Sequence, residues 1–151
     1  METTGDIFCT VETRCRAMDA ALVLTSEHPR PRISADVLDG LERAVVEAEH
    51  RSVPLIVTSA SKHFAFGADL DAALAEAAFG RVAMLDDALR NYQRVMLRIR
   101  YASIPVVAAV TGVAVSGGCE VLMHCARVVT HAGARSVSSR QPPELCRLVV
   151  D

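Results

Sequence analysis

The stretch Pro105-Val-Val-Ala-Ala-Val-Thr-Gly-Val-Ala-Val-Ser-Gly-Gly-Cys-Glu120 decides the fold of this chain, because an apolar run meets a pair of glycines and then a single carboxylate. With histidine counted as neutral, Glu120 is the only charge between Ala102 and Arg127. A β-branched run bounded by proline and glycine indicates a buried strand, and the glycine pair allows a tight turn into a helix. Unpaired N–H groups at such a helix start stabilise a developing anion, with Glu120 as a nearby acid or base.

The composition restricts the function classes. The length of 151 residues predicts one domain, and 51% hydrophobic residues with only 4% aromatic residues predict an aliphatic core. A net charge of -2 argues against nucleic acid or an anionic membrane as the partner. The five cysteines include no Cys-x-x-Cys pair, so the sequence predicts neither a disulfide framework nor a metal site.

The chain is expected to be cytoplasmic. Its start, Met1-Glu-Thr-Thr-Gly-Asp6, lacks the basic and apolar parts of a signal peptide. The uncharged run around 106–119 is shorter than the roughly 20 residues of a membrane helix, and it contains glycine. The cysteine usage also fits a reducing compartment.

Strand and helix patterns alternate along the chain. Ser34 is a predicted N-cap, because apolar residues follow it at helical spacing. Strands alternating with helices predict βαβ units in a mainly parallel sheet, with a ligand at the carboxyl ends of the strands. The fold class is therefore α/β, with predicted strands at 20–25, 53–58 and 106–110 and a long helix at about 81–101.

Two predicted loops each carry glycine beside small residues, namely Phe66-Gly-Ala-Asp69 and Ser116-Gly-Gly118. Together they predict a two-pronged site for an anion. On His63-Phe-Ala-Phe-Gly-Ala-Asp-Leu70 and the stretch 104–120, the chain resembles the crotonase family, the enoyl-CoA hydratase and isomerase group.

The resemblance is weaker over Ala20 to Thr58, and it continues through Val121-Leu-Met-His-Cys-Ala-Arg-Val-Val129. It implies a crotonase-like ββα superhelix core that is truncated here. The domain assignment is a poorly defined N-terminal segment 1–19, a partial crotonase-like domain 20–130, and a divergent tail 131–151.

The resemblance also implies the site residues. The backbone N–H groups of Ala68 and Gly117 would bind the thioester oxygen of an acyl-CoA, and Glu120 matches one of two hydratase glutamates that handle water and a proton. Ala65, Phe66 and Ala68 would contact CoA, with carbonyl groups near Ala65 and Phe66 meeting the adenine. CoA is then part of the substrate, no separate cofactor is expected, and the reaction belongs to fatty-acid β-oxidation.

Several positions depart from the family pattern. Asp71 stands where hydratases often have lysine, and Ser116 replaces the first glycine of the usual triplet. Arg140 falls where the second hydratase glutamate is expected, and Glu144 comes a turn late. The oligomerisation elements of the homo-oligomeric complete relatives are also missing after about Thr130.

These departures leave alternatives open. Hydration of a 2-enoyl-CoA is the expected ancestral reaction, and isomerisation is the second reading because it can proceed with one acidic group. The chain can also be an inactive, truncated CoA-binding relative. A third reading is a Clp-like serine peptidase with Ser116 as nucleophile, because Gly112-Val-Ala-Val-Ser-Gly-Gly118 resembles its nucleophile turn. In the plainest reading, Gly117 and Gly118 only permit close packing and Glu120 stabilises a helix start.

Overall fold

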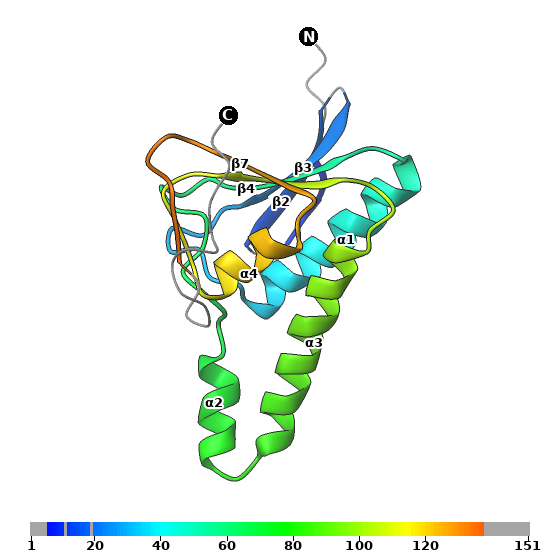
Figure 1. The fold of residues 1–151 in the computed structure, drawn as a ribbon. Coiled ribbons are helices and arrows are strands. Elements are labelled where there is room, and N and C mark those ends of the chain that lie inside the picture. The colour runs from blue at the N-terminus through cyan, green and yellow to red at the C-terminus, as the bar shows by residue number, and fades with distance from the viewer. Residues whose placement is uncertain (1–5, 11, 19, 138–151) are drawn as a thin grey trace.

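A six-stranded sheet with helices on one side forms the body of the protein (Figure 1). The computed structural model describes residues 6–10, 12–18 and 20–137. The elements are, in chain order, β1 (Asp6–Cys9), β2 (Thr13–Met18), β3 (Ala21–Ser26), α1 (Ala35–Arg51), β4 (Leu55–Ser59), α2 (Asp71–Ala78), α3 (Val82–Arg100), β5 (Val106–Val110), β6 (Val113–Val115), α4 (Gly117–His124), β7 (Arg127–Thr130) and β8 (Arg135–Val137).

The sheet is mainly parallel, as the sequence predicts. Its order is β1-β2-β3-β4-β5-β7, with antiparallel pairing from β1 to β3 and parallel pairing from β3 to β7. Helices α1 and α3 connect parallel neighbours, as in βαβ units. A separate parallel pair, β6 and β8, lies outside this sheet.

The hairpin of β1 and β2 lies in the segment 1–19, for which the sequence predicted no element. In β2, buried Thr13 and Cys15 alternate with the arginines Arg14 and Arg16. Arg14 pairs with Glu27 at 2.9 Å, and Arg16 pairs with Asp6 at 2.8 Å. Charged side chains on alternate positions leave the strand without a continuous apolar run, so its pattern is hard to distinguish from a polar segment.

Helix α1 begins where the sequence predicts. The Val37 N–H donates to Ser34 Oγ at 3.2 Å, which satisfies one of the unpaired donors at the helix start. The helix ends at Arg51, and the next residue, Ser52, caps it in the left-handed conformation with φ of 55°. Apolar residues at helical spacing form its buried face, which includes Leu41, Val45 and Ala48.

The core is aliphatic and lies between the sheet and its helices. The register aligns Leu22 with Leu55 and Leu55 with Val106, so these three buried side chains form one row across the sheet. Burying one such side chain contributes roughly 1.5–3 kcal/mol. The row holds three parallel strands together, and the loops at their carboxyl ends therefore have a fixed base.

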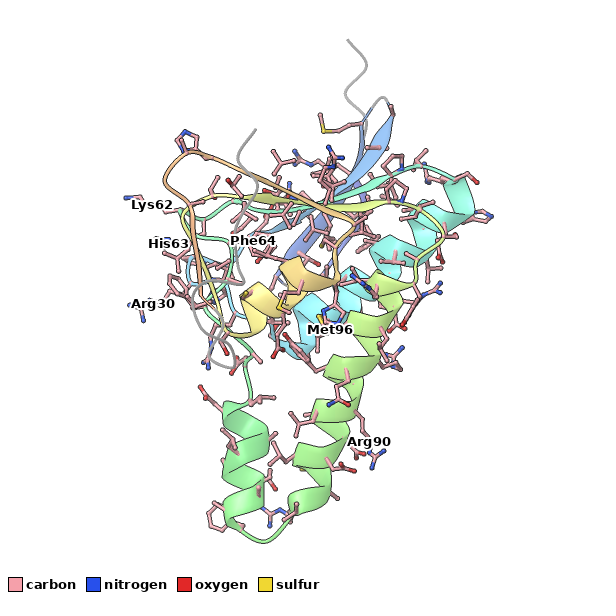
Figure 2. The ribbon with its side chains drawn as sticks, viewed as in Figure 1. Arg30, Lys62, His63, Phe64, Arg90 and Met96 are labelled. Carbon is pink, nitrogen blue, oxygen red and sulfur yellow. The ribbon has the colours of Figure 1, made fainter. Side chains whose placement is uncertain are left out.

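Helix α2 and the first half of α3 form an arm that projects away from the sheet (Figure 1). The two helices meet at Gly80, where φ is +81°. We call residues 71–91 the α2–α3 arm. Its exposed large apolar side chains are Leu74, Phe79, Val82, Met84 and Leu89. In Figure 2, Arg90 points outward from the arm.

Of the helices in the described ranges, none combines the length and the apolar character that crossing a membrane requires.

Candidate functional site

The loop after β4 is joined to strand β6, although some 50 residues separate them in the sequence. The N–H groups of Phe64 and Ala65 donate to the Val113 carbonyl at 2.9 and 3.3 Å, and the Val115 N–H donates to the Ala65 carbonyl at 3.0 Å. The Val113 N–H also donates to Nδ1 of His63 at 3.2 Å, and His63 lies beside Phe64 at this edge (Figure 2). The two predicted prongs of the site are therefore parts of one hydrogen-bonded unit.

A second set of hydrogen bonds fixes the segment around Ala68. The Phe66 N–H donates to the Pro31 carbonyl at 2.8 Å, the Ile33 N–H to the Gly67 carbonyl at 2.7 Å, and the Asp69 N–H to the Ile33 carbonyl at 2.9 Å. These bonds use backbone groups on both sides of Ala68. Because successive backbone groups of an extended segment point in opposite directions, the N–H of Ala68 faces away from Ile33.

The N–H groups of Ala68 and Gly117 lie close together. A Cβ built on Gly117 would lie 2.8 Å from the Ala68 nitrogen, and a Cβ built on Gly67 would lie 3.9 Å from the Gly117 nitrogen. Within the described ranges, neither N–H donates a hydrogen bond to the protein. The structure thus brings the two predicted donors together, and neither has a partner among the described residues.

Glu120 lies in the first turn of α4, three residues after Gly117. This spacing places both residues on one face of the helix. The Glu120 N–H donates to the Ser116 carbonyl at 3.0 Å, and Nδ1 of His124 contacts the Glu120 carbonyl at 2.7 Å. The partly exposed carboxylate of Glu120 forms no ion pair with any residue that the structure describes.

The predicted CoA contacts differ in their availability. The buried Ala65 already uses its carbonyl to accept from Val115. Phe66 is 42% exposed, and its ring meets His63 edge-on at 5.0 Å between centroids. The Phe66 carbonyl accepts no backbone hydrogen bond from the described part of the chain. Of the two carbonyls predicted to contact adenine, only that of Phe66 lacks a backbone hydrogen-bond donor among the described residues.

Asp71, the first departure from the hydratase pattern, is part of an ion-pair cluster with Arg32. Nη1 of Arg32 lies 2.8 Å from Oδ2 of Asp71 and 3.3 Å from Oδ1 of Asp69. The hydrogen bond from Arg32 lowers the pKa of Asp71 below its usual value, and it raises the pKa of Arg32. Arg32 thus brings a positive charge beside the acidic residue that replaces lysine. No local pattern predicts this pair, because 39 residues separate its members.

Ser116 occupies a backbone conformation that suits glycine. Its φ is 49° and its ψ is -118°, a region that non-glycine residues rarely enter and that costs of order 1–3 kcal/mol. Its side chain is exposed, and no histidine of the described ranges donates to or accepts from its hydroxyl. His124 contacts the Glu120 carbonyl and His131 the Ala132 carbonyl. The peptidase reading therefore has no nucleophile–base pair to support it.

Replacing Ser116 with glycine should stabilise the protein by about 1 kcal/mol. Relief of strain at positive φ exceeds the entropy that glycine adds to the unfolded chain, which is about 0.5–1 kcal/mol. Urea denaturation measures the change, with Ala60→Gly as a control because the exposed Ala60 has no positive φ. The control should lose stability. Equal losses in both variants would contradict the strain at Ser116.

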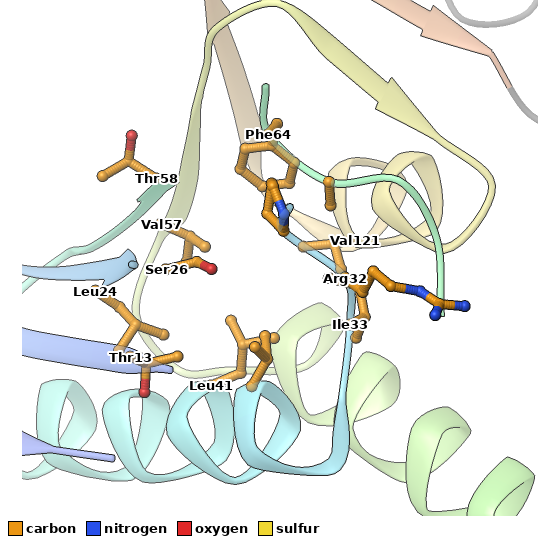
Figure 3. Close-up of a pocket in the computed structure, with 13 residues that line it drawn as sticks. Thr13, Leu24, Ser26, Arg32, Ile33, Leu41, Val57, Thr58, Phe64 and Val121 are labelled. Atoms are coloured by element: carbon orange, nitrogen blue, oxygen red, sulfur yellow. The ribbon is translucent and has the colours of Figure 1, made fainter. Parts of the chain in front are cut away.

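One small cavity lies beneath the loop that carries Ala65 (Figure 3). Its volume is about 20 Å³, which is room for roughly one water molecule. Its lining is largely apolar and includes Leu24, Leu41, Val57 and Phe64. This cavity is too small for an acyl chain, so it belongs to the packing of the core.

Tyr92 belongs to the site, although the sequence analysis did not identify it. Its hydroxyl donates to the Gly117 carbonyl at 2.9 Å. Helical spacing places it with Val95, Met96 and Ile99 on the buried face of α3. A signal was present, because a buried tyrosine hydroxyl needs a hydrogen-bond partner, but the partner cannot be identified from the sequence of the helix alone.

The described residues contain no cluster of three or more metal-binding side chains.

The described fold resembles solved structures of enoyl-CoA hydratases. An enoyl-CoA hydratase/isomerase from Xanthobacter autotrophicus Py2 aligns with a TM-score of 0.75 and 21% identity, over 86% of this chain and 49% of that chain. An enoyl-CoA hydratase from Rhodobacter sphaeroides aligns with a TM-score of 0.77 and 17% identity, over 84% and 39%. These likenesses confirm the predicted crotonase-like fold, and this chain spans half or less of either structure.

Curated relatives are much longer proteins. A probable 3-hydroxyacyl-CoA dehydrogenase from Bacillus subtilis is 30% identical over 96 residues, which are 64% of this chain and 12% of that protein. A putative fatty acid oxidation complex trifunctional enzyme from Rickettsia prowazekii is 31% identical over 91 residues, which are 60% of this chain and 13% of that protein.

The family model described as Enoyl-CoA hydratase/isomerase matches residues 26–140. The resemblance seen in the sequence was expected to end at about residue 130, so the match extends ten residues further. Because this match spans most of the sequence, the chain belongs to the enoyl-CoA hydratase/isomerase family.

Proposed function

We propose that this chain binds an acyl-CoA thioester and activates a 2-enoyl-CoA toward hydration through Ala68, Gly117 and Glu120. The convergence of two N–H groups at the start of α4, neither of which has a partner among the described residues, carries the proposal. The names of the relatives from fatty-acid oxidation and of the solved hydratases support this substrate class. The proposed compartment is the cytoplasm, and CoA enters as part of the substrate.

The proposed reaction begins at the thioester oxygen. The Ala68 and Gly117 N–H groups donate to this oxygen and stabilise the enolate that forms when a nucleophile adds to the conjugated double bond. One such donor contributes about 10²–10³ in rate in well-studied acyl-transfer sites. Water adds its oxygen to the β-carbon and loses one proton, and the α-carbon gains one proton. Both protons pass through acid-base groups, of which Glu120 is one. The product is the 3-hydroxyacyl-CoA.

Isomerisation is the second candidate. A double-bond shift moves one proton from the α- or γ-carbon to the other end of the same allylic system, so one carboxylate can remove it and return it. Glu120 is the only acidic residue of α4. The same N–H pair would stabilise the oxygen of the dienolate that forms when this proton is removed, and no water adds to the substrate. Binding of CoA thioesters without turnover is the alternative to both reactions.

A comparison of substrates tests the proposal. Crotonyl-CoA hydration and the isomerisation of a 3-enoyl-CoA are followed with this chain and with an extended chain in which the C-terminal half of a complete relative follows Thr130. We expect weak or no hydration by this chain and clear hydration by the extended chain. Isomerisation without hydration in both would favour the second candidate. Absence of thioester binding in both would overturn the proposal.

A further inference from the structure

We infer that Tyr92 is a positioning residue of the proposed oxyanion site, which it serves by fixing the backbone at Gly117. This inference rests on the proposed function, since it concerns the donors that would meet the thioester oxygen. The sequence motifs point to the loops and to α4. Tyr92 lies instead on α3, 25 residues before Gly117.

The phenol of Tyr92 is well held. Its side chain is 8% exposed, and Val95, Met96 and Ile99 on the same helix are buried in the core. Its hydroxyl donates to the Gly117 carbonyl at 2.9 Å, and this bond is buried. A tyrosine ring has few rotamers and little freedom once it is packed, so its hydroxyl is a fixed donor.

Three segments meet at Gly117. The position that a Cβ on Gly117 would take lies 2.8 Å from Oη of Tyr92 and 2.8 Å from the nitrogen of Ala68. Helix α3, the start of α4 and the loop that carries Ala68 therefore enclose one small space. Only glycine fits there, because real Cβ atoms do not approach other heavy atoms this closely.

Glycine at this position needs external support. It has the widest backbone freedom of any residue, so the direction of its N–H depends on the bonds made by its neighbours. The preceding peptide is held through the Ser116 carbonyl, which accepts from the Glu120 N–H at 3.0 Å. The following peptide belongs to the first turn of α4, and its Gly117 carbonyl also accepts from Tyr92. Tyr92 thus restrains one of the two peptides that set the direction of the Gly117 N–H.

Tyr92→Phe tests the role, because it removes the donor and keeps the ring. Tyr101→Phe is the matched control, since Tyr101 lies at the end of the same helix and is 78% exposed. The probe is a cinnamoyl-CoA with a para-dimethylamino group, whose absorption moves to longer wavelength as its thioester carbonyl is polarised. We expect Tyr92→Phe to bind the probe with unchanged affinity but a smaller red shift. In the extended chain, kcat should fall about tenfold with KM unchanged.

Backbone amide NMR signals provide a readout that does not depend on the substrate. In the free protein, the signals of Ala68 and Gly117 should move in Tyr92→Phe and stay in place in Tyr101→Phe. Unmoved signals, or an unchanged red shift in a variant that binds the probe, would overturn the inference. If the native chain binds no thioester, the proposed function fails, and the two amide signals still decide whether Tyr92 positions this backbone.

A second substitution covers the case in which Tyr92→Phe does not fold. The chain has two tyrosines, so fluorotyrosine incorporated into Tyr101→Phe labels position 92 alone. Fluorine beside the hydroxyl makes the phenol a stronger donor and leaves the ring in place. The amide signals of Ala68 and Gly117 should then shift relative to the unlabelled control. No shift would contradict the positioning role.

Discussion

Replacing Gly112 with alanine is expected to destabilise the fold by about 4 kcal/mol or more, a loss that can prevent folding. Gly112 has φ of +59°, which by itself costs a residue with a Cβ about 1–2 kcal/mol. The added Cβ would also lie 2.1 Å from the Lys62 carbonyl oxygen and 2.6 Å from Nδ1 of His63. The nearest obstacle is backbone, so a side-chain rotation does not relieve the clash.

The same substitution should disturb the site. Relief of the clash requires the segment of Lys62 and His63 to move away from the turn at Gly112. That movement breaks the hydrogen bond from the Val113 N–H to His63, and it strains the bonds from Phe64 and Ala65 to Val113. These bonds join the two loops that carry the predicted donors. Stability and thioester binding should therefore be lost together.

Gly80→Ala is the matched control for Gly112→Ala. Gly80 has φ of +81°, yet a Cβ there would have no heavy atom within 4 Å. Its replacement should cost only the conformational penalty, about 1–2 kcal/mol. Urea denaturation of the three proteins measures the difference. A Gly112→Ala protein no less stable than Gly80→Ala would show that the turn at Gly112 can open without loss.

Replacing Glu120 with glutamine should lower hydration by the extended chain by about 10²–10⁴-fold. This is the usual contribution of a group that transfers a proton in the transition state, and glutamine keeps the size of the side chain without its proton chemistry. Since the Glu120 carboxylate has no ion-pair partner in the described ranges, the free energy of unfolding should change by less than about 1 kcal/mol.

A comparison with an exposed carboxylate isolates the effect of Glu120. Asp87→Asn removes one negative charge from the exposed surface of the α2–α3 arm. Its activity should match that of the unsubstituted extended chain. Steady-state kinetics and binding of the chromophoric thioester are measured for both variants. Full hydration by Glu120→Gln would remove Glu120 from the proposed mechanism, and lost binding would assign it to substrate contact.

The sequence predicted those parts of the fold that depend on local pattern. The run 106–110 is bounded by proline and glycine and is strand β5, and the glycine pair that follows opens α4. Ser34 was identified as an N-cap because the helical spacing begins directly after it. In each case the decisive information lies within a few residues, where periodicity and backbone preference act.

Contacts between distant segments could not be predicted in this way. Strand β6 (113–115) lies between the predicted strand 106–110 and the predicted turn at the glycine pair, where no separate strand was expected, and it pairs with β8. The hydrogen bond of Tyr92 and the ion pair of Arg32 each join parts of the chain that only the complete fold brings together. The proximity of Ala68 and Gly117 was predicted from the shared edge of parallel strands and from a family resemblance, and their catalytic roles stay predictions.

The α2–α3 arm should open without unfolding the rest of the protein. No described residue of α2 is buried, and the buried residues of α3 all lie from Tyr92 to Ile99, beyond the arm. Hydrogen exchange should therefore be much faster for the amides of α2 than for those of α1, because separation of the two arm helices exposes little additional apolar surface. Trypsin should also cut after Arg81 at the arm's turn while the sheet stays folded. The arm is a local unit of low stability, and a ligand or subunit that packed on it would slow its exchange and leave that of α1 unchanged.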